Sequence, residues 1–206
     1  MIPEGSEELN RGLPHIGARR LKFRAAIGIA AVIALLTPGA AFAKTNNTFD
    51  PLGDQTATDS PPVGSHEMDI TKFTTTYKRT GITVRIKVAA MDIDDVNRVE
   101  VMMLGTNGYL VLISGKFDQT SSEFAVMNGS SLRQLSRIGC SGFSASVKQS
   151  AKLMTFKVPA GCVGGASAIK TAAATTALFA AGGELNDDVN GDGTFSGPWV
   201  PKRRAH

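Results

Sequence analysis

The chain has few of the residues that common catalytic and metal sites need. Its 206 residues include two cysteines and three histidines, and neither Gly-x-Ser-x-Gly nor His-Glu-x-x-His occurs. A nucleophile elbow and a cysteine–histidine zinc site are therefore both excluded. His15 lies near the start of the chain, His206 is the last residue, and His66 is predicted to be exposed in a loop.

Basic and acidic residues occur in similar numbers in the chain. The 22 lysines and arginines and 18 acidic residues give a formal net charge of +4. Because no basic stripe with interleaved aromatic residues occurs, nucleic acid is not a predicted partner. Aromatic residues are also scarce. Tyr77, Tyr109 and Trp199 are candidates for stacking on sugar rings, and a role in the core or at its rim is the alternative.

An uncharged apolar run over residues 25–36 is too short for a comfortable membrane span. Basic residues precede it, and the small-x-small triplet Ala41-Phe42-Ala43 follows it. This order predicts a secretory signal peptide over residues 1–43 and a secreted protein with no membrane span after cleavage. An uncleaved N-terminal anchor is the alternative. Arg19-Arg20 loosely matches a twin-arginine signal, so both export routes stay open, as does the position of the true start codon.

The two cysteines flank the clearest hairpin pattern. Between Cys140 and Cys162, apolar and polar residues alternate on both sides of a polar turn at Ser150-Ala151. A hairpin folded there pairs residues whose numbers sum to about 301, and the cysteines lie within about one residue of that register. They are therefore predicted to form a disulfide in an oxidising compartment.

Period-two alternation predicts further antiparallel strands. Residues 82–91 form the cleanest half-buried strand, and 70–78 form its hairpin partner. Asn107-Gly108 between two apolar arms is a strong hairpin signal. Residues 166–181 are rich in alanine, which favours a helix, but the threonines and the β context favour a strand; both stay open. The predicted fold class is all-β: an antiparallel β-sandwich, immunoglobulin-like or jelly-roll-like, with one disulfide.

The predicted organisation has four parts. A signal peptide covers residues 1–43, an acidic proline-containing loop 44–67, the β-sandwich 68–201 and a basic tail 202–206. Asp50, Asp54 and Asp59 lie in that loop, which leads into Met68-Asp69-Ile70. Such a loop could lie against the sandwich edge and coordinate a hard cation, and a solvated linker is the alternative.

The sharpest motif begins at Asp188. Asp188, Asn190 and Asp192, followed by Gly193, match the first half of an EF-hand-type loop, and they are candidate calcium ligands. The bidentate acid that ends such loops is missing, because Trp199 occupies its position. Asp187 or a carboxylate from the acidic loop is a candidate to complete the set. A turn without any metal is the alternative.

The whole mature chain, from the acidic loop that enters at Met68-Asp69-Ile70 to Pro198-Trp199-Val200, resembles a broad group of secreted bacterial β-sandwich proteins. The shared features include a threonine-rich first strand, the strand beginning at Ile82 and the hairpin closed by the two cysteines. The layout is also similar in pattern to carbohydrate-binding and DOMON-like sandwiches. No ligand-binding residue of those families maps onto an identifiable position.

The predicted function is a secreted, non-catalytic binding module for cell-wall or environmental glycan, with calcium as a candidate stabilising ion. A structural or interaction protein of the cell envelope, which docks another protein, is the first alternative. A hydrolase with a carboxylate pair assembled from distant parts of the chain is the third hypothesis. Fold class cannot choose among them, because β-sandwiches host all three.

Overall fold

The computed structural model describes residues 45–58, 65–179, 183–189, 195 and 198–203. The predicted signal peptide lies outside this part of the chain. Within the described part, no helix is long and apolar enough to cross a membrane.

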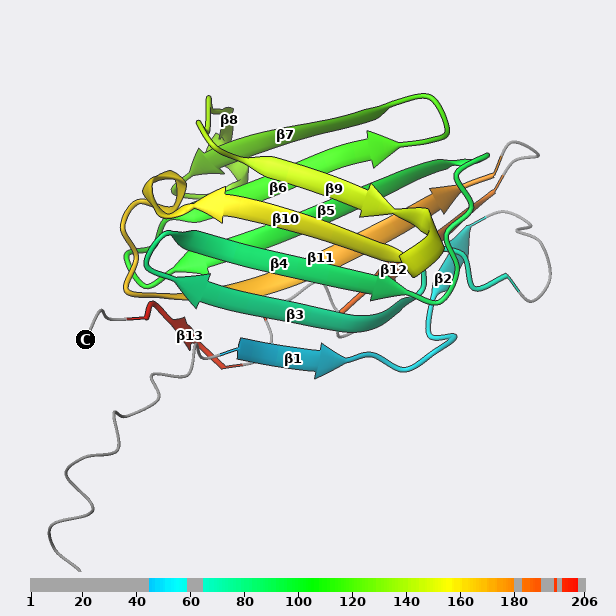
Figure 1. The fold of residues 1–206 in the computed structure, drawn as a ribbon, viewed down its shortest axis with the longest axis horizontal. Coiled ribbons are helices and arrows are strands. Elements are labelled where there is room, and N and C mark those ends of the chain that lie inside the picture. The colour runs from blue at the N-terminus through cyan, green and yellow to red at the C-terminus, as the bar shows by residue number, and fades with distance from the viewer. Residues whose placement is uncertain (1–44, 59–64, 180–182, 190–194, 196–197, 204–206) are drawn as a thin grey trace, which may run out of the picture. The chain divides into compact units, whose positions relative to one another are not determined.

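Antiparallel strands in two packed sheets form the domain, which confirms the predicted β-sandwich (Figure 1). The five-stranded sheet contains, in spatial order, β1 (Thr45–Phe49), β3 (Ile70–Lys78), β4 (Gly81–Val88), β10 (Leu153–Pro159) and β9 (Ser144–Lys148). The eight-stranded sheet contains, in spatial order, β2 (Thr56–Thr58), β12 (Glu184–Asp188), β11 (Ala168–Leu178), β5 (Val96–Gly105), β6 (Leu110–Phe117), β7 (Ser122–Gly129) and β8 (Ser136–Arg137), with β13 (Val200–Pro201) also paired to β11. Short 3₁₀ turns cover Leu132–Gln134, Gln149–Ala151 and Ala160–Val163.

Alternating side chains place the core between the sheets. On β4, Ile82, Val84 and Ile86 are buried, whereas Arg85 and Lys87 point to solvent. This is the pattern of a strand with one face on a core. Phe124 of β7 meets Phe156 of β10 across the interior, with ring centroids 5.4 Å apart in an edge-to-face arrangement.

The disulfide hairpin is confirmed. Strands β9 and β10 pair Leu153 with Lys148 and Met154 with Val147, which is the register that the sequence predicts. Cys140 and Cys162 form a disulfide with their Cα atoms 5.8 Å apart.

The alanine-rich segment is a strand, as its threonines suggested. Strand β11 pairs with β5 over ten residue pairs and with β12 on its other side. Thr171, Thr175 and Ala177 point inward and are buried. The Thr171 hydroxyl lies 2.7 Å from that of Thr75 on the opposite sheet, so this polar pair satisfies itself inside the core.

The acidic segment 44–67 differs from the predicted loop, because it contains β1 and β2. Strand β1 pairs with β3 at the edge of one sheet, and β2 pairs with β12 at the edge of the other. Both strands are short and largely polar, so they carry no apolar alternation that could reveal them. At the start of the predicted basic tail, the Lys202 and Arg203 N–H groups donate to the Ser167 and Tyr77 carbonyls.

Candidate metal centre

Five aspartates from three separate parts of the chain gather at one end of the sandwich. Asp50 follows β1, Asp54 precedes β2, Asp69 precedes β3, and Asp187 and Asp188 end β12. We call these five residues the acidic cluster. Because β1 and β2 belong to different sheets, the loop carrying Asp50 and Asp54 crosses from one sheet to the other and meets the end of β12.

Three of these carboxylates are close enough to share one ion. One oxygen each of Asp50, Asp54 and Asp187 lies within 4.8 Å of the other two. Two oxygens bound to the same calcium ion at 2.3–2.6 Å can be at most about 5 Å apart. The spacing therefore fits common coordination of one hard cation.

Asp69 is held against the same loop. Its side chain is 0% exposed, and its Oδ2 accepts a hydrogen bond of 2.7 Å from the Gly53 N–H, between Asp50 and Asp54. The same oxygen lies 3.2 Å from Nδ1 of His66. Oδ1 of Asp69 is buried and has no hydrogen-bond partner.

A tight turn before β3 sets the direction of Asp69. Met68 is buried with φ of 59°, a left-handed conformation that is uncommon for a residue other than glycine. Its N–H donates to the Ala90 carbonyl at 3.0 Å, and its carbonyl accepts from the Thr175 hydroxyl at 2.5 Å. The Asp69 carbonyl accepts from the Ala89 N–H at 2.7 Å. These bonds fix the backbone on both sides of the carboxylate.

The cluster leaves several buried oxygens without a donor. Like Oδ1 of Asp69, Oδ2 of Asp50 and Oδ1 of Asp188 are buried and have no hydrogen-bond partner. Asp187, 5% exposed, has one satisfied oxygen, which accepts from the Ile70 N–H. Buried polar atoms normally find a partner, since leaving a carboxylate oxygen unpaired is costly. Asp50, which carries one of these three oxygens, also belongs to the trio of carboxylates that lie close enough to share an ion.

The electrostatics of the cluster favour the uptake of positive charge. Burial, together with the negative charges of Asp54, Asp188 and Asp69, raises the pKa of Asp50 to about 6. Burial and the neighbouring aspartates raise the pKa of Asp187 to about 7, although the Ile70 N–H acts in the opposite direction. Carboxylates so shifted take up a proton or bind a cation near neutral pH.

Comparisons with known proteins add no family to this picture. No protein-family model, curated protein or solved structure matches the chain. The resemblance to secreted bacterial β-sandwich proteins stays a prediction, and the chemistry of the acidic cluster follows from its own residues.

The predicted EF-hand-type ligands coincide with the acidic cluster at one position. Asp188 belongs to the cluster, whereas Asn190 and Asp192 lie outside the described residues. His66 is exposed, as predicted, but its contact with Asp69 was not expected. In the sequence, the signal for Asp69 was its position as a polar residue directly before a buried strand. The burial of Asp69 depends on the loop that carries Asp50 and Asp54.

The aromatic candidates do not form a sugar-stacking platform. Tyr77 is fully buried, and its hydroxyl donates to the Ala166 carbonyl at 2.7 Å. Tyr109 is half-buried and packs against the core. Of the three, Trp199 is the exposed one, and the Lys170 ammonium lies 5.6 Å from its ring centroid. Tyr77 is therefore excluded as a sugar-stacking side chain, and of the three candidates Trp199 stays accessible.

Proposed function

We propose that this protein is an exported, non-catalytic β-sandwich module that binds a glycan and is stabilised by one calcium ion in the acidic cluster. The observation that carries the calcium assignment is the spacing of the Asp50, Asp54 and Asp187 carboxylates, which have oxygens within 4.8 Å of one another. Buried carboxylate oxygens without a hydrogen-bond partner on Asp50, Asp69 and Asp188 add to it. A cation supplies the positive charge that these oxygens otherwise lack.

Calcium suits the cluster better than magnesium. Calcium accepts six to eight oxygens in irregular arrangements, whereas magnesium demands near-octahedral geometry and keeps several waters. Five aspartates from three chain segments offer many oxygens without a regular arrangement. Among the described residues, His66 is the basic side chain in contact with these carboxylates, with its Nδ1 3.2 Å from Oδ2 of Asp69.

The ion would hold the N-terminal segment on the sandwich. Strands β1 and β2 pair at sheet edges and bury few apolar side chains, so they contribute little hydrophobic stabilisation. A calcium ion bound by Asp50, Asp54 and Asp187 would tie their connecting loop to β12. We therefore expect calcium to order this segment as well as to raise overall stability.

The test is thermal unfolding of the purified protein in EDTA, in 1 mM calcium chloride and in 1 mM magnesium chloride. At a calcium concentration one hundred times the Kd, binding adds about 2.7 kcal/mol, which corresponds to several degrees in Tm. Calcium should raise the Tm, magnesium should do so much less, and terbium luminescence should report the same site. Equal Tm values in EDTA and calcium would refute the metal site.

Glu123→Gln is the matched control for substitutions of carboxylates in the acidic cluster. This carboxylate is on β7, its side chain is 72% exposed, and its ion pair with Lys116 is long at 3.8 Å. The substitution removes one surface carboxylate without touching the cluster. It should leave the calcium-dependent rise in Tm unchanged.

A role as an interaction protein of the cell envelope is the second candidate. Phe49 and Leu52, on either side of Asp50, are 72% and 59% exposed. Large apolar side chains this exposed often mark a contact surface. If they dock on an envelope protein, the double variant Phe49→Ser, Leu52→Ser should lose co-sedimentation with envelope fractions and keep its calcium response. Unchanged co-sedimentation would remove this candidate.

A further inference from the structure

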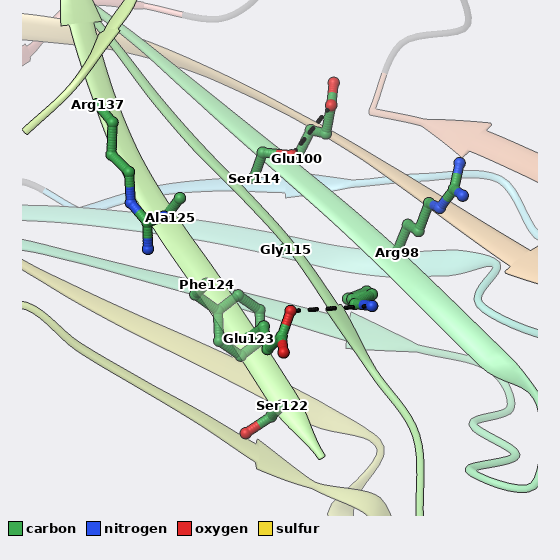
Figure 2. Close-up of a pocket in the computed structure, with 10 residues that line it drawn as sticks. Arg98, Glu100, Ser114, Gly115, Ser122, Glu123, Phe124, Ala125 and Arg137 are labelled. Carbon is green, nitrogen blue, oxygen red and sulfur yellow. Dashed lines mark hydrogen bonds and ion pairs between the residues drawn. The ribbon is translucent and has the colours of Figure 1, made fainter.

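The outer face of the eight-stranded sheet carries a groove over β5, β6 and β7, with β8 at one side (Figure 2). Its volume is about 760 Å³, which is within the range of sites that bind small ligands. Its lining is rich in charged side chains, and we call it the charged groove.

Strand register explains the hollow. Ser114 on β6 pairs with Ala125 on β7, so two small side chains lie side by side on the outer face. Residues two positions away on a strand point to the same face. In the next row, Lys116 pairs with Glu123, and both are long. Small residues beside a row of long ones leave a depression in the sheet surface.

The floor of the groove is supported from beneath. Gly115 and Phe124 pair on the inner face, and a Cβ atom at Gly115 would collide with the Phe124 ring. Phe124 can therefore lie across Gly115 and reach Phe156 in the opposite sheet. This contact ties the middle of the groove to the core, so the site is preorganised.

Charges of both signs line the walls. The Lys116 ammonium lies 3.8 Å from Glu123, and the Ser114 hydroxyl donates to Glu100 at 3.3 Å. Three cations and two carboxylates leave one positive charge in excess. The guanidinium groups of Arg98 on β5 and Arg137 on β8 have no hydrogen-bond or ion-pair partner among the described residues, and Figure 2 shows these side chains on opposite sides of the groove.

We propose that the charged groove binds an acidic polysaccharide whose sugars bear carboxylates, that is, a polyuronate. This inference rests on the proposed function as a glycan-binding module and gives its ligand class. The unpartnered guanidinium groups of Arg98 and Arg137 can each bind a sugar carboxylate through two hydrogen bonds. Glu100, Glu123 and Ser114 accept hydrogen bonds from sugar hydroxyls between them.

The same residues disfavour other glycan classes. A neutral polysaccharide would bind mainly by stacking on aromatic rings, and the charged groove offers Phe124 alone, which is committed to the core. A heavily sulfated polysaccharide carries more than one negative charge per sugar, which an excess of one cation cannot balance, and it would meet Glu100 and Glu123. One carboxylate per sugar, spaced by hydroxyls, matches the alternating charges.

The experiment is calorimetric titration of oligogalacturonate into protein expressed from the full chain, in EDTA so that no calcium bridges protein and ligand. Methyl-esterified oligogalacturonate, which has the same chain without charge, is the matched control ligand. The free acid should bind at least about tenfold more tightly than the ester, since each lost charge-assisted contact costs about that factor. Equal binding of acid and ester, no binding of either, or tighter binding of heparin than of the acid would each overturn the proposal.

Substitutions then locate the site. Arg98→Gln and Arg137→Gln should each weaken oligogalacturonate binding by about tenfold. Arg85→Gln is the matched control, because Arg85 is exposed on the outer face of β4 in the other sheet. An equal loss of oligogalacturonate affinity in all three variants would mean non-specific electrostatic attraction. It would overturn the assignment of the binding site to the charged groove.

Failure of the calcium site can be told apart from failure of the groove. Uronate binding in EDTA without any effect of calcium on Tm would sustain the groove and refute the metal site. A calcium-dependent rise in Tm without uronate binding would sustain the metal site and refute the charged groove as a uronate site.

Discussion

Replacing Asp187 by asparagine should change stability in opposite directions with and without calcium. Asparagine keeps an oxygen that can accept from the Ile70 N–H, and its NH₂ group can donate to the carboxylates of Asp50 and Asp54. The substitution therefore removes the buried negative charge while preserving the local shape. Without calcium, that charge destabilises the folded protein; with calcium, it is a ligand.

The expected size follows from the position of Asp187. Its pKa rises from 3.8 to about 7, roughly three units, and each unit corresponds to 1.36 kcal/mol. In EDTA at pH 8, where the group is mostly ionised, the variant should be more stable than the wild type by at most roughly 4 kcal/mol. For a domain of this size, that is a rise in Tm of up to roughly 8–16 °C.

Circular dichroism melts of the two proteins at pH 8, each in EDTA and in calcium, provide the assay. Calcium should raise the Tm of the wild type and leave that of Asp187→Asn nearly unchanged. A variant that is less stable than the wild type by the same amount in both buffers would refute the reasoning. Asp187 would then act only through its bond to the Ile70 N–H.

Three further predictions concern pH, the disulfide and the groove floor. In the folded protein, the pKa values of Asp50 and Asp187 are about 6 and about 7, above the usual 3.8, so the calcium-free folded protein binds more protons than the unfolded chain. Its Tm should therefore rise as pH falls from 8 to 5. A flat or falling Tm would contradict this. Oxidised protein should contain no titratable thiol, and Cys140→Ser should cost about 3 kcal/mol in a urea melt, because the disulfide closes a loop with a sequence separation of 22. Gly115→Ala should lower stability by about 1–3 kcal/mol, since its Cβ would collide with the Phe124 ring. Gly139→Ala is the control and should be nearly neutral, because there is open space around its Cβ. Equal effects of the two substitutions would refute the role of Phe124 beneath the charged groove.

Local patterns made the strands predictable. The alternation on β4 predicted that Ile82 and Val84 point inward. In the hairpin between the cysteines, the positions of the turn and of the apolar residues predicted the register. Such features need only neighbours along the chain or across one turn. The alanine-rich β11 stayed open between strand and helix, because its ladder with β5, far away in sequence, overrides local propensity.

The polar edge strands could not be predicted in this way. Thr45–Phe49 contains one large apolar residue, Phe49, which is exposed. Its strand conformation comes from hydrogen bonds to the edge of β3, a strand about 25 residues further along the chain. Because these bonds form between backbone groups, the side-chain sequence carries little trace of them.

The sequence alone determined the β class, the inward faces of the long strands and the cysteine pairing, because each follows from spacing along a local segment. It also singled out acidic residues near Asp50, Asp69 and Asp188 as candidates for a hard cation. Only the tertiary structure decided that they meet, by pairing β1 and β2 with different sheets so that their loop crosses to the end of β12. Burial and mutual repulsion, which give these carboxylates their chemistry, arise only when residues more than one hundred positions apart come together.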